Sequence, residues 1–238
     1  MDDSRAISST TLCTVARAAA LAGLATLAIS VALARLPETG AARTACGGTL
    51  PSLVRFQLAL TVSDVEDALG PAGACREAAI AAMDAVNRLD VRAYIATYGA
   101  FLLLSLWVVM TEARRRGFWL VVVVVGIALV ADVIETTRQL AITADLAGAA
   151  RHLPLLIVAA RAKFIGLAIA TLAASWAGWH ARPRRILLAA SCVPVASLLP
   201  LALAAPKAYG DLATLSLGIA WVVLLGSVSR AALRTRRA

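Results

Sequence analysis

Two carboxylates stand where one of the most apolar runs of the chain comes to an end. Asp132 and Glu135 follow the stretch "FWLVVVVVGIALV" and precede Thr136 and Gln139. The four residues are spaced i, i+3, i+4 and i+7, which places them on one face of a helix. Ionisable groups at membrane depth are costly and normally face a bundle interior or a water-filled cavity. We therefore expect a buried polar site, where the charge is met by protonation, a cation or a lipid head group.

Another apolar run carries a matching polar stripe near one of its ends. Asn87, Asp90, Tyr94, Thr97 and Tyr98 recur at helical spacing, so they share one face. Tyrosine hydroxyls and a further carboxylate at this level would complete a polar wall opposite Asp132 and Glu135 if the two helices pack together.

A third run contributes a basic group. Arg161 and Lys163 are two residues apart, about 200° around a helix, so both cannot point inward. Small residues mark the side on which helices approach closely. The side of Lys163 carries such a stripe, formed by Gly166, Ala170, Ala173, Ala174 and Ala177. Lys163 is therefore predicted to face the bundle, and Arg161 to reach the outer interface.

The candidate site combines three acids with one inward base. Its predicted members are Asp90, Tyr94, Tyr98, Asp132, Glu135 and Lys163. One interpretation is a hydrogen-bonded network that only fixes the register of the helices. The other is a polar pocket that opens to the outer leaflet, since intramembrane ionisable residues are functional candidates. That general rule favours the pocket, where protonation, a cation or a lipid head group would meet the excess of acids.

Several established chemistries lack their residues. His152 and His180 are the only histidines and fall at opposite ends of one predicted span, which excludes a membrane haem held by two histidines. No Cys/His cluster suggests zinc, and no phosphate-binding glycine motif is present. We expect no metal and no cofactor. Asp132 or Glu135 would act as acid or base if a reaction occurs, but no nucleophile accompanies them.

The elements that position these residues are membrane-spanning helices. The chain has 238 residues, of which 61% are hydrophobic and 16% charged, whereas soluble domains average about 25% charged. The apolar runs approach the length of about 20 residues that crosses a bilayer. We predict an all-α polytopic membrane protein, a single bundle over 1–238, with about six transmembrane helices near 14–34, 92–111, 118–138, 157–179, 186–205 and 212–229.

Arginine clusters set the orientation. The net charge is +9, and basic residues gather in "TEARRRG", "HARPRR" and the tail "RAALRTRRA". Such clusters between spans are topology signals rather than a nucleic-acid surface. We expect both termini in the cytoplasm, and the richness in alanine and arginine is typical of a high-GC bacterium. The predicted location is the bacterial inner membrane, with membrane lipids as partners, no nucleic acid and no protein partner indicated.

The first span has two interpretations. Ala32-Leu33-Ala34 fits the cleavage pattern of a signal peptide. The acids in "MDDSR" and the length of the apolar run favour an uncleaved anchor instead. Cleavage would leave five spans with the same topology.

The segment 35–91 is predicted to be a short, helical, extracytoplasmic segment. Ser63 and Glu66 have capping-box spacing, the run 70–73 contains helix breakers, and one helix is expected from Arg76 into the second span. Cys46 and Cys75 would form a disulfide in an oxidising compartment, and two unpaired thiols are the alternative.

Two further expectations concern later segments. Residues 139–156 are predicted to lie along the outer interface and to end near Pro154. Five tryptophans lie mostly towards the inner ends of the predicted spans and are interpreted as interface anchors rather than a cofactor site: Trp107, Trp119, Trp176, Trp179 and Trp221.

Short motifs resemble those of an uncharacterised group of bacterial multi-pass integral membrane proteins. The similar stretches are "FQLALTVSDVEDALG", "LDVRAYIATYGAFLL", "ADVIETT" and the lysine of "ARAKF". In that group an Asp-x-x-Glu-Asn pattern occurs in a later span, and Thr136 stands here in place of the asparagine. The resemblance covers residues 56 to 165. It implies no activity and adds weight to the same polar residues.

The sequence therefore favours a membrane protein that binds or processes a lipid-like, amphipathic ligand. A small proton-coupled transporter and a non-catalytic assembly or scaffold subunit remain as alternatives. The substitution Glu135→Gln separates these functions. It should alter the bound ligand of a lipid-binding protein, abolish the proton-dependent flux of a transporter, and change only the stability of a scaffold subunit.

Overall fold

A computed structural model describes residues 9–48, 52–113, 117–181 and 184–234. This part of the chain is helical almost throughout and contains no strand. Six of its helices are long and apolar enough to cross a membrane, which confirms the predicted all-α polytopic architecture. They are α1 (Ser9–Ala34), the continuous α5 (Ala74–Leu89) to α6 (Ile95–Glu112), α7 (Phe118–Ala144), α8 (Ala149–His180), α9 (Ile186–Ala204) and α10 (Pro206–Arg234).

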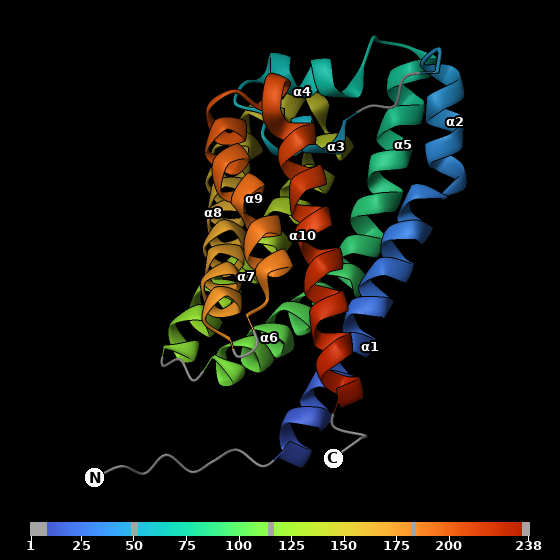
Figure 1. Ribbon diagram of the computed structural model, residues 1–238. Coiled ribbons are helices and arrows are strands. Elements are labelled where there is room, and N and C mark those ends of the chain that lie inside the picture. The colour runs from blue at the N-terminus through green and yellow to red at the C-terminus, as the bar shows by residue number, and fades with distance from the viewer. Residues whose placement is uncertain (1–8, 49–51, 114–116, 182–183, 235–238) are drawn as a thin grey trace.

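Three short helices gather at one end of the bundle. They are α2 (Pro37–Ala45), α3 (Leu53–Gln57) and α4 (Val62–Leu69), and they lie at the top of Figure 1 beside the upper part of α5. We call this the cap end. At the opposite end, the terminal end, α1 begins and α10 ends (Figure 1).

The start of α4 differs from the prediction. The Thr61 hydroxyl accepts a hydrogen bond from the Asp64 backbone N–H, and the Thr61 backbone N–H donates to the Asp64 carboxylate over 3.0 Å. The capping box is thus Thr61–Asp64 and not Ser63–Glu66, because Ser63 already lies inside the helix. Gly70 and Gly73 adopt positive φ and separate α4 from α5, as the glycines and proline of 70–73 predict.

The helix that rises from the cap end into the second span is continuous, as predicted. A π-helical turn, η1 (Asp90–Tyr94), joins α5 to α6 without a break. The sequence pattern did not reveal this turn. π-Turns inside α-helices occur frequently at functional sites, and this one carries Asp90 and Tyr94.

The prediction for residues 139–156 is wrong. α7 continues to Ala144, the short turn η2 (Leu146–Gly148) follows, and α8 begins at Ala149 with Pro154 inside it. The extra turns of α7 are held by packing, since Ile142 is fully buried in a second apolar cluster beneath α3 and α4. Tertiary burial thus extends α7 into the segment 139–156, whose amphipathic pattern had predicted a position along the membrane interface.

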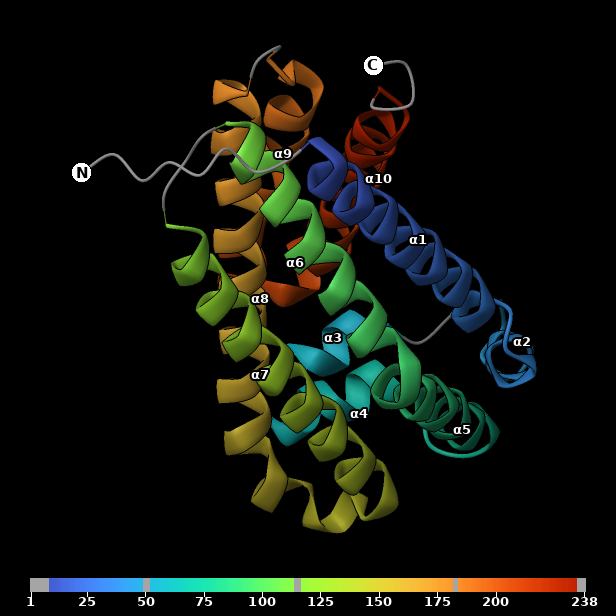
Figure 2. The same ribbon diagram turned by 90° about the horizontal axis from the view of Figure 1, so that it is seen from below.

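Close packing of α7 against α8 positions the polar residues. Figure 2 shows the two helices side by side along one flank of the molecule. A Cβ at Gly166 would lie 2.7 Å from the Cβ of Ala128, so only glycine permits this approach. Ala170, Ala174 and Ala177 of α8 are also buried, and Ala170 and Ala174 lie opposite residues of α6, α9 and α10. The outward face of α7 is apolar and exposed, with Val130 61% accessible.

Candidate functional site

Lys163 of α8 is the centre of a buried ion cluster. Its Nζ lies 3.0 Å from Oδ1 of Asp132 and 2.7 Å from Oε1 of Glu135, both on α7. All three residues are at most 5% exposed. Arg161, in contrast, is exposed. Buried charges require paired and hydrogen-bonded partners, and here one ammonium serves two carboxylates.

Neutral groups complete the hydrogen bonding of these acids. The Tyr98 hydroxyl of α6 donates to Oδ2 of Asp132 over 2.5 Å. Gln139, one turn along α7, donates from Nε2 to Oε1 of Glu135 over 2.9 Å. The cluster thus links α6, α7 and α8 at one level.

Asp90 and Tyr94 approach the same cluster from the π-turn. The Thr136 hydroxyl of α7 donates to Oδ2 of Asp90 over 3.2 Å. The Tyr94 hydroxyl accepts a hydrogen bond from Ser30 of α1 over 3.3 Å, and the rings of Tyr94 and Tyr98 are 5.4 Å apart. The structure therefore brings all six candidate residues together.

Buried polar atoms on Glu135 and Gln139 of α7 and on Asn87 of α5 lack a hydrogen-bond partner. They are Oε2 of Glu135, Oε1 of Gln139 and Nδ2 of Asn87. Buried polar atoms normally have a protein, water or ligand partner. None of these three residues lines the cavity described next, so the atoms lie inside the protein and not on its wall.

A cavity of about 390 Å³ adjoins the cluster. Its polar side is formed by Asp90, Tyr94, Asp132 and Lys163, together with Ser30. The facing walls are apolar and come from α1, α3 and α5, with Leu33, Ala34, Leu53, Val54, Ala79, Ala82, Met83 and Val86. A space with a charged floor and apolar walls matches an amphipathic molecule.

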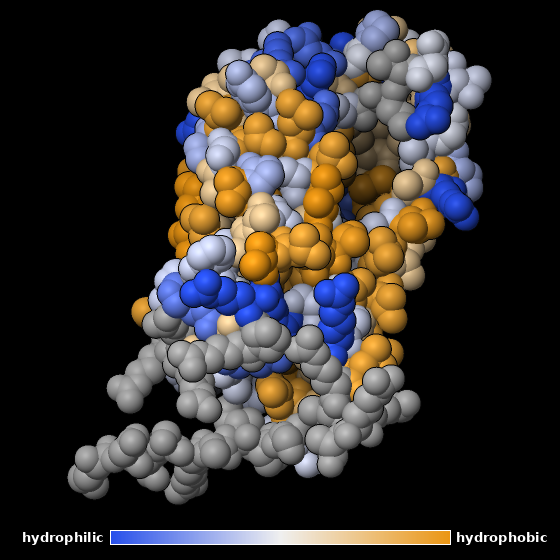
Figure 3. All heavy atoms as spheres, in the orientation of Figure 1, coloured by the Kyte–Doolittle hydropathy of each residue, from blue (hydrophilic) through white to orange (hydrophobic). Residues whose placement is uncertain are grey.

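The cavity exists because α1 and α10 diverge toward the cap end. They meet lower down at Gly23, where a Cβ would lie 2.8 Å from Leu225 and from Phe101. Figure 3 shows a hollow on the side of the molecule between α10 and the α1–α5 flank, at the level where the surface is mainly hydrophobic. The opening is therefore lateral.

Several neighbouring residues were not predicted from the sequence. The Thr143 hydroxyl donates to Oδ1 of Asp84 over 2.6 Å and joins α7 to α5 above the cluster. Ser30 belongs to an alanine-rich run with no polar pattern. The interpretation of Trp221 as an interface anchor is wrong, because its ring packs within the bundle, 5.3 Å from that of Tyr98.

A disulfide supports the wall of the cavity. Cys46, at the end of α2, is bonded to Cys75, in the first turn of α5, with Cα atoms 4.8 Å apart. Thr39 of α2 and Ala79 of α5 both line the cavity. The cross-link thus holds two of its walls together.

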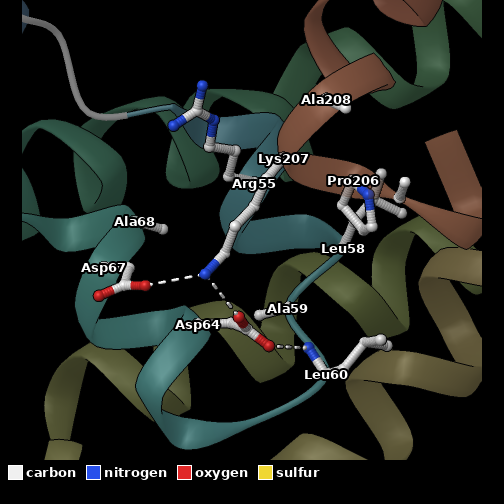
Figure 4. A pocket seen from close by; sticks show the side chains of 11 residues that line it. Arg55, Leu58, Ala59, Leu60, Asp64, Asp67, Ala68, Pro206, Lys207 and Ala208 are labelled. Atoms are coloured by element: carbon white, nitrogen blue, oxygen red, sulfur yellow. Dashed lines mark hydrogen bonds and ion pairs between the residues drawn. The ribbon is translucent and has the colours of Figure 1, made fainter.

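A second cavity of about 560 Å³ separates α4 from the start of α10. Figure 4 shows Lys207 of α10 reaching between two aspartates of α4. Its Nζ lies 3.2 Å from Oδ1 of Asp64 and 2.9 Å from Oδ2 of Asp67. The Lys207 side chain is 63% exposed, so solvent screens these two ion pairs and their contribution to stability is modest. These ion pairs connect α10 to α4, which follows α3, a wall of the first cavity.

No group of three or more metal-binding side chains is arranged to hold a metal ion within the described ranges. Comparison of the chain with models of protein families, with curated proteins and with solved structures found no match. The resemblance over residues 56–165 stays an expectation from short motifs, and the function is argued from the geometry of the site.

Proposed function

We propose that this is a bacterial inner-membrane protein that binds an amphipathic, lipid-like ligand near the outer leaflet. The observation that carries the proposal is the cavity beside Lys163, which joins a buried charged cluster to apolar walls and opens sideways. Ligand pockets typically enclose about 300–1,000 Å³ and combine apolar walls with a few polar groups. A lateral opening at the level of the apolar belt admits a lipid directly from the bilayer.

The cap end is proposed to face the outside. α6, α8 and α10 all end at the terminal end (Figure 1), and the arginine-rich stretches of the sequence follow these three helices. Basic connections remain in the cytoplasm. The disulfide lies at the cap end, which suits an oxidising compartment. This orientation places the cavity in the outer half of the membrane and both termini inside.

The charge of the site restricts the ligand. Lys163 pairs with Asp132 and Glu135, and Asp90 lines the same cavity, so carboxyl groups outnumber bases in the cluster. A head group with a cationic amine or several hydroxyl donors complements it better than a bare phosphate. The acyl part would occupy the walls formed by Met83, Val86 and Leu33.

Native mass spectrometry of the gently solubilised protein tests the proposal. We expect wild type to retain a discrete lipid mass that Glu135→Gln and Lys163→Met lose. Val86→Phe places a larger side chain in the cavity and should also lose it, whereas Val130→Phe, on the exposed face of α7, should retain it.

The outcomes separate the three candidate functions. Bare protein in every spectrum, with altered stability in the ion-cluster variants alone, would overturn ligand binding and leave the scaffold role. Proton-dependent flux in vesicles that Glu135→Gln abolishes would instead establish a transporter. Bare spectra contradict our proposal. Proton-dependent flux contradicts it as well if the wild-type protein retains no lipid.

A further inference from the structure

A groove at the terminal end forms a separate site. It measures about 510 Å³ and lies between the start of α9 and the last turns of α10. It is lined by Arg184, Arg185, Ile186, Leu187, Leu188, Val222, Val223, Gly226, Ser227 and Arg230. Guanidinium groups and apolar side chains thus share one groove, far from the cap-end cavity and made of different residues.

The three arginines have different roles. Arg185 is held within the protein, where its guanidinium donates to the Glu112 carboxylate and to the Ser227 carbonyl and hydroxyl. Arg184 stacks on Trp179, with Cζ 5.2 Å from the ring centre, and Arg230 is exposed. No ion pair among the described residues neutralises Arg184 or Arg230. Two positive charges therefore remain available at the groove.

The first turn of α9 adds further donors. The backbone N–H groups of Ile186, Leu187 and Leu188 have no acceptor within the helix. Arg185 occupies the N-cap position and provides no side-chain capping bond. Because an N-terminus of this kind attracts anions, its donors and the guanidinium groups of Arg184 and Arg230 suit the same negatively charged group.

The apolar part of the groove decides what kind of anion binds. Ile186, Leu187 and Val222 are 60%, 69% and 58% exposed, on helices that are apolar enough to span the membrane. A free anion would use only the donors, whereas a phospholipid uses the donors and the apolar surface together. Basic pockets between transmembrane helices bind acidic head groups in this way.

We infer that this groove binds one acidic phospholipid of the leaflet at the terminal end. The phosphate would lie between Arg184, Arg230 and the start of α9, and the acyl chains would follow Leu187 and Val222. The Arg185–Glu112–Ser227 contacts hold α6, α9 and α10 in register around it. A bound lipid would therefore stabilise the junction of these three helices.

The test is a native mass spectrometry titration of the full-length protein with phosphatidylglycerol and with phosphatidylcholine of identical acyl chains. We expect wild type to prefer phosphatidylglycerol by about tenfold, and Arg184→Gln and Arg230→Gln each to lower that preference about fivefold. Arg17→Gln is the matched control, because Arg17 is exposed on α1 and does not line the groove. An excess of inorganic phosphate should not displace the lipid.

Two results would overturn the inference. One is equal affinity of wild type for both lipids. The other is an Arg17→Gln effect as large as that of Arg184→Gln, which would show diffuse attraction to a basic surface. Since the three substituted side chains include no ion-paired group, circular dichroism should report the same helicity for all variants. Binding at the cap-end cavity does not affect the comparison, which measures only the change caused by each arginine.

Discussion

Nζ of Lys163 lies 2.7 Å from Oε1 of Glu135, and Glu135 is fully buried. The pair joins α8 to α7 at the level where Tyr98 of α6 reaches Asp132. The Lys163 ammonium group therefore pairs with the acids through which α6, α7 and α8 are joined, and its contribution to stability can be measured.

Removal of that ammonium should destabilise the protein strongly. Lys163→Met leaves Asp132 and Glu135 buried without a cation, and breaking a buried pair in this way costs about 3–5 kcal/mol. Thermal unfolding in detergent measures the loss. The double variant Lys163→Met with Glu135→Gln no longer carries the unpaired Glu135 carboxylate, so it should be more stable than Lys163→Met alone. Additive losses would show that the two groups do not interact.

Gly166 should be essential to the packing of α7 on α8. A methyl group there would lie 2.7 Å from the Ala128 Cβ, and overpacking typically costs about 1–3 kcal/mol. Gly126→Ala is the control, because no atom lies within 4 Å of its added Cβ. That variant should be neutral or slightly more stable, since glycine is a poor helix former. Equal effects at the two positions would contradict the close approach.

Reduction of the disulfide should loosen the cap end. Cys46 and Cys75 have a sequence separation of 29, and closing a loop of this size stabilises by about 3.6 kcal/mol in the chain-entropy model. We expect reductant to lower the unfolding temperature of wild type and not of Cys46→Ser with Cys75→Ser. Cys13 and Cys192 are buried, unbonded thiols, and their serine variants should keep the sensitivity. Alkylation of four thiols without reductant would refute the bond.

Acid should release α4 from its cap. Burial raises the pKa of the Asp64 carboxyl, but hydrogen bonds from the Thr61 hydroxyl, Lys207 and two backbone N–H groups outweigh burial and hold the pKa below its ordinary value. A carboxyl group whose pKa is lower in the folded than in the unfolded protein stabilises the fold at a pH above the unfolded-state pKa. This stabilisation is lost as the pH falls through the folded-state pKa. Hydrogen exchange of α4 should therefore rise below about pH 4.

A matched pair of variants tests this assignment. Asp64→Asn should raise hydrogen exchange in α4 already at neutral pH and remove most of the acid response. Glu66→Gln should change neither, because Glu66 is exposed and is not part of the observed capping box. An effect of Glu66 equal to that of Asp64 would restore the cap that the spacing of Ser63 and Glu66 suggested.

Local patterns in the sequence determined the helical architecture and the composition of the polar layer. Apolar runs define the six long helices, because each must satisfy its own backbone hydrogen bonds in a bilayer. Helical periodicity placed Asp132, Glu135 and Gln139 on one face. The small residues that follow Lys163 identified the side of α8 that packs inward. These inferences need only neighbours within a few turns.

The tertiary structure alone decided how that layer becomes a cavity. The contacts of Ser30 with Tyr94 and of Thr143 with Asp84 join residues 64 and 59 positions apart, and no periodicity within one helix encodes them. The lateral opening depends on α1 and α10 meeting at Gly23 and then diverging, with α3 and α5 as walls. Crossing geometry arises from side chains of several helices packing at once, so the space between them belongs to the assembled fold.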